Sequence, residues 1–221
     1  MLNKKNTVQT ILAQFKGNQM RKYGDYNISK KMFGFLIGAK LGDGALIQRT
    51  INHNTYICFK HAENQYEYLK WKYSFLLKNG VIRNKTIRKR NFTKGQLDSW
   101  QDQYYFSTIS LKEFNYFKKI TNNEAIHLLD EFSLSIWILD DGGFYGNACT
   151  IGCARFSKKE REELVRILKT KFDLDSYSYE HPEGKTRGYV RIRSTEYKKV
   201  KCIVFKNIDK NIDVIKYKFK E

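Results

Sequence analysis

The sequence has few of the residues that mark secreted, zinc-bound or linker-joined chains. It contains one proline and four cysteines, and no two cysteines form a Cys-X-X-Cys pair. This spacing argues against a disulfide framework and against a zinc module. We therefore expect reduced, partly buried thiols in an intracellular protein. Since there is also no serine- or glycine-rich stretch, we expect no flexible linker between parts of the chain.

Long apolar runs are missing as well. No stretch approaches the length of a membrane span, the N-terminus has no signal-peptide pattern, and no long basic amphipathic helix is visible. A membrane partner is therefore not expected. The composition is still that of a folded protein, because 41% of the residues are hydrophobic and 15% are aromatic. At this length the chain can form one large domain or two of about 100 residues.

Positive charge is present in large excess. Forty-one lysines and arginines stand against 23 acidic residues, which gives a net charge of +18. A surplus of this size exceeds what a solubilising surface needs and is typical of a protein that neutralises nucleic-acid phosphates. The abundance of lysine, asparagine, isoleucine and tyrosine fits an AT-rich genome. That composition is compatible with an organelle matrix (mitochondrion or chloroplast) or with a bacterial or phage-infected cytoplasm.

Two apolar runs, each ending in an acidic residue and glycine, form the main repeated feature. They are Leu-Ile-Gly-Ala-Lys-Leu-Gly-Asp-Gly at 36–44 and Leu-Ser-Ile-Trp-Ile-Leu-Asp-Asp-Gly at 134–142. Their apolar positions predict buried helices, the first beginning after Ser29 as N-cap. Gly38 and Gly42 share one face of that helix, which predicts close approach of another backbone. We also expect Gly44 to end the helix in the left-handed conformation.

Each run lies in the first helix of the same order of elements, which is helix, hairpin, helix, hairpin and helix. This order predicts an α+β protein made of two similar halves, with a basic N-terminal extension at 1–28, a first repeat at 29–120 and a second at 121–221. In the first repeat we expect hairpins at 45–51/55–60 and 82–92/103–109, with helices at 64–78 and 111–120. In the second we expect a helix capped by Asp130 or Ser133, strands near 145–153, helices at 158–172 and 196–205, and a hairpin at 176–180/189–193.

The acidic residues at the two helix ends point to a metal site. A carboxylate in the last turn is disfavoured by the negative end of the helix dipole, and a divalent cation would reverse that penalty. Carboxylate oxygens suit Mg²⁺. A single Asp-Gly would be ordinary turn chemistry. Because the pattern occurs twice in a strongly basic chain, we expect Asp43 and Asp141 to meet at a shared site.

The hairpins offer basic side chains for a DNA groove. Alternation places Arg88 and Arg90 on one strand face, and Arg191 and Arg193 on its counterpart. Two-stranded ribbons fit the major groove, where arginine and glutamine read base edges. The alternative is that these residues form the ordinary solvent face of a sheet. The candidate DNA-binding residues are Gln48, Arg49, Thr50, Lys60, Arg88, Arg90, Arg155, Arg187, Arg191 and Arg193.

The two runs resemble the motifs of LAGLIDADG homing endonucleases, in the single-chain branch that carries two repeats. The second run, with Asp-Asp-Gly after a tryptophan-containing apolar stretch, is the closer match. The first shares its leucine, Gly38 and the terminal Asp43-Gly44. The resemblance covers about residues 30–221. It implies two pseudo-symmetric αββαββα repeats, a DNA-binding saddle of antiparallel sheets, and Mg²⁺-dependent double-strand cleavage across the minor groove.

The resemblance also implies roles for single residues. Asp43 and Asp141 correspond to the metal-binding catalytic pair, with two or three Mg²⁺ ions that Mn²⁺ can replace. Asp140 either shares or replaces the role of Asp141, and Gly42 joins the metal site. The family places a lysine near the site after each repeat. The matching positions here are Lys118 or, with a shift of one, Lys119, and Lys218 in a terminal Tyr-Lys pair.

Three functions are compatible with these features. The leading one is a site-specific DNA endonuclease that acts as a monomer, since two non-identical repeats can read a long non-palindromic site without a symmetry operator. The second is an RNA maturase that assists splicing of a host group I intron. The third is a DNA-binding protein that does not cleave. The presence of both aspartates and of the lysine candidates favours the nuclease.

Overall fold

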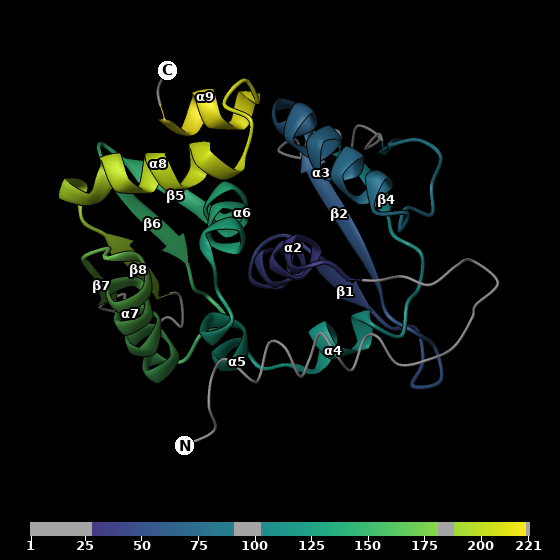
Figure 1. Ribbon diagram of the computed structural model, residues 1–221, viewed down its shortest axis with the longest axis horizontal. Coiled ribbons are helices and arrows are strands. Elements are labelled where there is room, and N and C mark those ends of the chain that lie inside the picture. Colours follow the sequence, from purple (N-terminus) through teal and green to yellow (C-terminus); the bar gives the residue numbers. More distant parts are fainter. Residues whose placement is uncertain (1–27, 91–102, 181–187, 220–221) are drawn as a thin grey trace, which may run out of the picture.

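A computed structural model of the protein describes residues 28–90, 103–180 and 188–219. Two four-stranded antiparallel sheets, one from each half of the chain, lie on either side of two central helices (Figure 1). The predicted α+β class with two similar halves is therefore confirmed. Within the described ranges, every helix is too short or too polar to cross a membrane.

The two central helices are the ones predicted from the repeated runs. They are α2 (Lys30–Leu41) and α6 (Glu131–Asp141), and they pack against each other at the middle of the molecule (Figure 1). Ser29 caps α2, because its hydroxyl accepts the Met32 N–H at 3.1 Å. Asp130 caps α6 through a capping box with Ser133. Both helices are buried on nearly all sides, as their apolar sequences predict.

Glycines on α2 allow the two helices to approach closely. A Cβ atom on Gly38 would lie 2.7 Å from the Ser133 carbonyl oxygen, and one on Gly42 would lie 2.6 Å from Asp140 Cβ. The predicted close backbone approach is thus confirmed. Among the described glycines, Gly80 and Gly146 have positive φ angles and Gly44 does not. The predicted left-handed conformation of Gly44 is therefore wrong. Gly44 is instead required for space, since a Cβ there would lie 2.6 Å from the Ala39 carbonyl oxygen.

The first sheet has the strand order β1-β2-β4-β3, and helix α3 packs on it. Phe59 and Phe106 face each other across β2 and β4 and are fully buried. The first strand is shorter than predicted and ends at residue 47. Beyond it the Gln48 side chain donates to the His53 carbonyl oxygen at 2.8 Å and closes the turn. The elements are β1 (Ala45–Ile47), β2 (Tyr56–Ala62), 3-10 helix η1 (Glu63–Gln65), α3 (Tyr66–Lys78), β3 (Arg88–Arg90) and β4 (Gln103–Ser107).

The second sheet repeats this topology with the order β5-β6-β8-β7. Helices α7 and α8 pack on its half of the molecule. Its first strand begins at Gly142, immediately after α6, whereas the sequence placed the strands from residue 145. The elements are β5 (Gly142–Tyr145), β6 (Ala148–Gly152), α7 (Lys158–Phe172), β7 (Ser176–Tyr179), β8 (Tyr189–Ile192), 3-10 helix η2 (Ser194–Glu196) and α8 (Tyr197–Asn207).

Three short helices join and close the halves. Helix α4 (Phe114–Lys119) lies within the predicted 111–120 segment, whereas α5 (Asn122–His127) and α9 (Asp213–Phe219) were not predicted. Helix α5 begins with a capping box between Thr121 and Glu124. Helix α9 packs against α3, β5 and α6, so the end of the described chain contacts both halves. The four cysteines are free, and burial raises the pKa of Cys149 and Cys153 to about 12.

Candidate active site at the ends of the central helices

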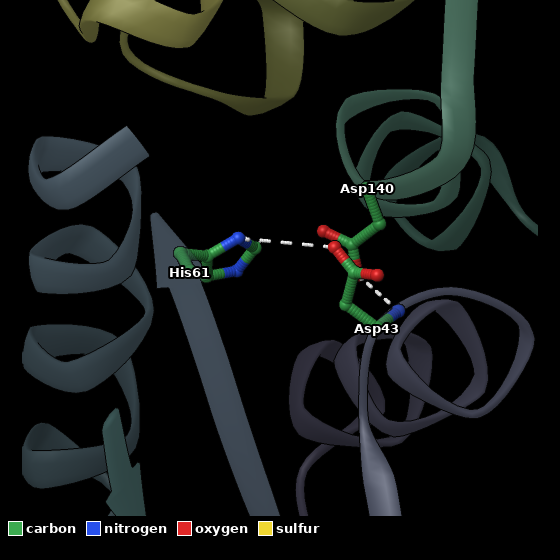
Figure 2. A group of neighbouring side chains, drawn as sticks. All are labelled: Asp43, His61 and Asp140. Atoms are coloured by element: carbon green, nitrogen blue, oxygen red, sulfur yellow. Dashed lines mark hydrogen bonds and ion pairs between the residues drawn. The ribbon is translucent and has the colours of Figure 1, made fainter. Parts of the chain in front are cut away.

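Helices α2 and α6 end at the same side of the molecule and are joined there. The Asp43 backbone N–H, just after the end of α2, donates to Asp140 Oδ2 at 3.0 Å, as Figure 2 shows. Asp141 is the last residue of α6 and is exposed. The glycine face of α2 is what permits this meeting, because any larger residue at position 42 would collide with Asp140.

The carboxylates at this end are electrostatically strained. Burial raises the pKa of Asp43 to about 7, the negative charge of Asp140 adds to the shift, Lys72 opposes it, and Asp141 adds a smaller increase. The pKa of Asp141 is also raised, because protein atoms partly desolvate its carboxyl group although the residue is exposed, and because Asp140 is negatively charged, while Arg155 lowers it. Carboxylates that resist ionisation are stabilised by a nearby cation. The oxygen donors of Asp43 and Asp141 therefore fit a hard divalent metal such as Mg²⁺.

A second group of candidate ligands lies deeper, where Asp43, His61 and Asp140 bring ligand atoms within 4.8 Å of one another (Figure 2). Both ring nitrogens of His61 are already engaged. Nε2 lies 3.0 Å from Lys72 Nζ, and Nδ1 lies 2.7 Å from Gln65 Oε1. Burial lowers the pKa of His61 to about 4, so the ring is neutral. Because Lys72 can only donate, Nε2 accepts and the proton sits on Nδ1, which donates to Gln65.

Asp140 is held by the interior of the protein and not by solvent. Its Oδ1 accepts from Lys72 Nζ at 2.5 Å and from the Tyr68 hydroxyl at 2.8 Å. The side chains of Lys72 and Asp140 are both 0% exposed. The adjacent Asp141 lies at an open cleft beside the second sheet. Asp140 and Lys218 reach the wall of the same cleft, which is further lined by Gln65, Tyr145, Arg191 and Tyr217.

The lysine candidates occupy two different surroundings. Lys218, on α9, is buried, and its Nζ donates to the carbonyl oxygens of Ile138 at 3.0 Å, Leu139 at 2.7 Å and Gly142 at 2.7 Å. Ile138 and Leu139 lie in the last turn of α6 and Gly142 directly follows it, so Lys218 caps the helix that carries Asp141. Burial lowers the pKa of Lys218 to about 8.

Lys118 and Lys119 end helix α4. Both lysines are exposed, and Lys118 Nζ donates to the carbonyl oxygen of Leu46, three residues beyond Asp43, at 3.0 Å. Burial lowers the pKa of Lys40, and the charges of Lys118 and Arg155 lower it further. Lys40, Lys118 and Arg155 thus form a group of cations, hereafter the basic cluster. Arg155 also acts on Asp141, so the cluster borders the carboxylates.

The first sheet presents part of the predicted DNA-binding set on one face. Tyr105 on β4 pairs with Lys60 on β2 on one side and with Arg88 on β3 on the other. Two residues away on β4, Gln103 pairs with Arg90. Lys60, Arg88 and Arg90 are exposed, and the two arginines are two residues apart on β3 and share a face. Lys89 between them is exposed as well, so exposure does not distinguish the two faces of this strand.

The predicted strand positions of Gln48, Arg49 and Thr50 are wrong. All three lie in the turn after β1, where Thr50 Oγ1 lies 2.6 Å from His53 Nδ1. Arg49 is exposed there. Side-chain hydrogen bonds of this kind compete with the strand ladder and end it early.

The second sheet holds its arginines over tyrosine rings. Arg191 lies 5.7 Å from the Tyr145 ring centre, and Arg193 lies 5.6 Å from that of Tyr177. These distances are within the range of cation–π attraction. Arg193 follows the end of β8, and Arg155 lies between β6 and α7, so neither is in a strand. Arg187 lies outside the described residues.

Several residues of the site were missed from the sequence although signals for them existed. Tyr68, Lys72 and Leu76 recur every four residues on α3 and are all fully buried, so Lys72 lies on an apolar stripe. On β2 every second residue, Ile57, Phe59 and His61, is buried on the same face. A charged residue on such a stripe indicates a buried partner, which the sequence alone did not identify.

Together, the paired sheets and the joined acidic helix ends define a protein with two repeats around a shared carboxylate centre. A family model, that of the LAGLIDADG DNA endonuclease family, matches residues 33–200. The chain belongs to this family.

Relatives with curated names carry two kinds of description. Cytochrome b mRNA maturase bI2 of Debaryomyces hansenii is 26% identical over 157 residues, which are 67% of this chain and 60% of that protein. Intron-encoded endonuclease ai4 of Dictyostelium discoideum is 34% identical over 113 residues, 46% of this chain and 71% of that protein. The chain thus spans less than two thirds of this maturase.

Solved structures show the same fold. The homing endonuclease I-WcaI bound to its DNA recognition sequence matches with a TM-score of 0.69 and 21% identity, over 99% of this chain and 98% of that one. I-DmoI in complex with DNA and Mn matches with a TM-score of 0.51 and 15% identity, over 79% and 96%. At 21% and 15% identity, these two matches show that the fold is shared.

Proposed function

We propose that the protein is a site-specific DNA endonuclease that hydrolyses both strands of a long asymmetric target across the minor groove. The observation that carries this proposal is the junction of α2 and α6. There, burial and then the negative charge of Asp140 raise the pKa of two aspartates from equivalent motif positions. The repeats at 29–120 and 121–221 each contribute one of these aspartates and one sheet.

In this proposal Asp43 and Asp141 hold the divalent ions, with the backbone of Gly42 beside them. Two or three Mg²⁺ ions, or Mn²⁺ in their place, would activate water and stabilise the leaving oxygen. The protein orients each carboxylate from a rigid helix end. The basic cluster of Lys40, Lys118 and Arg155 neutralises phosphate beside the carboxylates. Lys218 keeps the end of α6 in place through three carbonyl oxygens.

The two sheets would straddle DNA with different surfaces. Lys60, Arg88 and Arg90 contact phosphates and bases from the first sheet, and Arg191 and Arg193 do so from the second. Since the halves are not identical, a single chain reads a non-palindromic site and acts as a monomer. The solved structures of I-WcaI and I-DmoI contain those proteins bound to DNA, which supports DNA as the partner here.

Cleavage of a randomised plasmid library with Mg²⁺ tests the proposal. We expect the wild-type protein to linearise a specific subset of plasmids. Asp43→Asn and Asp141→Asn should each lower double-strand cleavage by at least about a thousandfold, whereas DNA binding should change by less than about threefold. Lys210→Met, on the exposed surface before α9, is a matched control for loss of one charge. Full cleavage by either aspartate variant would contradict the metal assignment.

A maturase function is the second candidate, because two relatives are named cytochrome b mRNA maturases. Splicing of a group I intron transcript in the presence and absence of the protein tests it. Stimulated splicing that survives Asp43→Asn and Asp141→Asn would support RNA binding without use of the carboxylates. Specific DNA binding with no cleavage in Mg²⁺ or Mn²⁺ and no effect on splicing would support the third function, a non-cleaving DNA-binding protein.

A further inference from the structure

The most deeply buried charged pair of the described chain connects the two halves beside the proposed catalytic centre. Lys72, on α3 of the first half, donates to Asp140, on α6 of the second half, at 2.5 Å. Both side chains are 0% exposed. Such a pair is costly to bury unless the remaining donors and acceptors are satisfied.

The remaining groups of this pair are satisfied. Asp140 Oδ1 also accepts from the Tyr68 hydroxyl at 2.8 Å, and Oδ2 accepts from the Asp43 N–H at 3.0 Å. Lys72 Nζ has a second acceptor in His61 Nε2 at 3.0 Å. The Lys72 Nζ also lies 4.4 Å from the Tyr68 ring centre, within range of a cation–π contact. Both oxygens of Asp140 are therefore used within the protein.

The ammonium group of Lys72 takes the position that a cation would need in order to bridge Asp140 and His61. Figure 2 shows Asp43, His61 and Asp140 directed at one another, and Lys72 contacts the last two. A metal ion bound to His61 Nε2 would have to displace this lysine. The three-residue group is thus completed by a side chain of the protein itself.

The arrangement has no counterpart at the other motif. In the first run the residue before the terminal aspartate is Gly42, and in the second it is Asp140. A Cβ atom on Gly42 would lie 2.5 Å from Asp140 Oδ2. The glycine therefore leaves room for the carboxylate to reach the Asp43 N–H.

We propose that Lys72 and Asp140 form a positioning pair for Asp43, and that Asp140 is not a metal ligand. Asp140 fixes the backbone of Asp43 by accepting its N–H, and Lys72 neutralises Asp140 and holds it in that orientation. The inference rests on the proposed function only in taking Asp43 as a metal ligand. It assigns Asp140 a role different from that of Asp141, although the two residues are adjacent.

Charge removal and metal binding can be measured without DNA. The variants are Lys72→Met, Asp140→Asn, the double variant Lys72→Met/Asp140→Asn, Asp43→Asn, and Lys70→Met as control. Lys70 lies on the same helix, with its side chain 58% exposed. Thermal unfolding followed by circular dichroism reports stability. Titration with Tb³⁺, competed with Mg²⁺, reports metal affinity of the full chain.

The proposal predicts a charge-pair pattern in stability. Lys72→Met leaves an uncompensated buried carboxylate and should lower Tm by about 10 °C, whereas Lys70→Met should change it by less than about 2 °C. The double variant should recover at least half of the loss, because no buried charge remains and the amide oxygen at position 140 still accepts the Asp43 N–H. A double variant whose loss of Tm equals the sum of the losses of the two single variants would overturn the positioning pair.

Metal affinity separates a positioning residue from a ligand. We expect Asp43→Asn to weaken Tb³⁺ binding more than tenfold and Asp140→Asn to weaken it less than threefold. A loss more than tenfold for Asp140→Asn, equal to that of Asp43→Asn, would show Asp140 to be a ligand and overturn the inference. If the wild-type protein failed to cleave DNA, the proposed function would fall, while the stability pattern would still decide the role of the pair.

Discussion

The ends of α2 and α6 have nearly the same sequence pattern and very different surroundings. Helix α2 ends in Gly42 and leads to Asp43, whose side chain is 34% exposed. Helix α6 ends in Asp140 and Asp141, of which the first is buried and the second is exposed. A duplicated motif therefore supplies a symmetric pair, Asp43 and Asp141, and a third carboxylate that belongs to one half only. Repetition of sequence does not imply repetition of environment.

The largest expected effect is a pH dependence of stability and metal affinity, which should differ between variants of Asp43 and Asp141. The folded pKa of Asp43 is raised to about 7. Between its usual pKa near 4 and pH 7 the folded state therefore holds a proton that the unfolded chain has lost. Metal-free stability should fall as pH rises through this window and then level off. Metal affinity should rise, by up to about tenfold per unit, and also level off above about pH 7.

Tb³⁺ titrations from pH 5 to 8.5 test this expectation in the wild type and in two variants. Asp43→Asn should remove most of the pH slope between 5 and 7, whereas Asp141→Asn should retain it. An unchanged slope in Asp43→Asn would show that another group controls metal binding.

The next largest effect concerns the residue before the terminal aspartate, which is Gly42 at the end of α2 and Asp140 at the end of α6. Gly42→Ala introduces a Cβ atom 2.6 Å from Asp140 Cβ. Overpacking of this kind should lower the free energy of unfolding by about 2 kcal/mol. Gly152→Ala is the control, because its Cβ would lie 3.4 Å from the Asp141 carbonyl oxygen. Urea denaturation measures both; equal stabilities would contradict the tight junction.

A smaller effect is expected from the lysines at the end of α4. Lys118 contacts the strand that follows Asp43, and Lys119 is exposed. Lys118→Met should slow cleavage of a selected target by about tenfold through loss of phosphate stabilisation. Lys119→Met should slow it by less than about twofold. Single-turnover rates at saturating protein distinguish them, and a larger effect of Lys119→Met would reverse the assignment.

The smallest effect is expected from the arginine–tyrosine contact that the second sheet carries. In the second sheet Tyr145 lies under Arg191, so Tyr145→Leu should weaken DNA binding by about threefold through loss of the cation–π contact. Tyr145→Phe keeps the ring and should bind as the wild type does. Electrophoretic mobility shifts at fixed salt measure both affinities. Equal weakening by the two variants would point to the hydroxyl group instead of the ring.

Local features of the fold were predictable from the sequence. Ser29 and Asp130 cap the central helices because a short polar side chain precedes each apolar run. The strand pairs also lie near their predicted positions. The sequence Thr-Asn-Asn-Glu at 121–124 also carries the capping-box pattern that starts α5. Helix α9 has no comparable signal, since seven residues are too few for a clear apolar period.

The sequence by itself determined the two buried helices, their acidic ends and the positive charge around them, because these depend on local periodicity and composition. Only the tertiary structure decided which carboxylate faces inward. Asp140 and Asp141 are neighbours in the chain, and their difference arises from Lys72, which is 68 residues away from Asp140 in sequence. A buried charge is defined by its partner, and that partner is brought to it by packing of α3 against the opposite half.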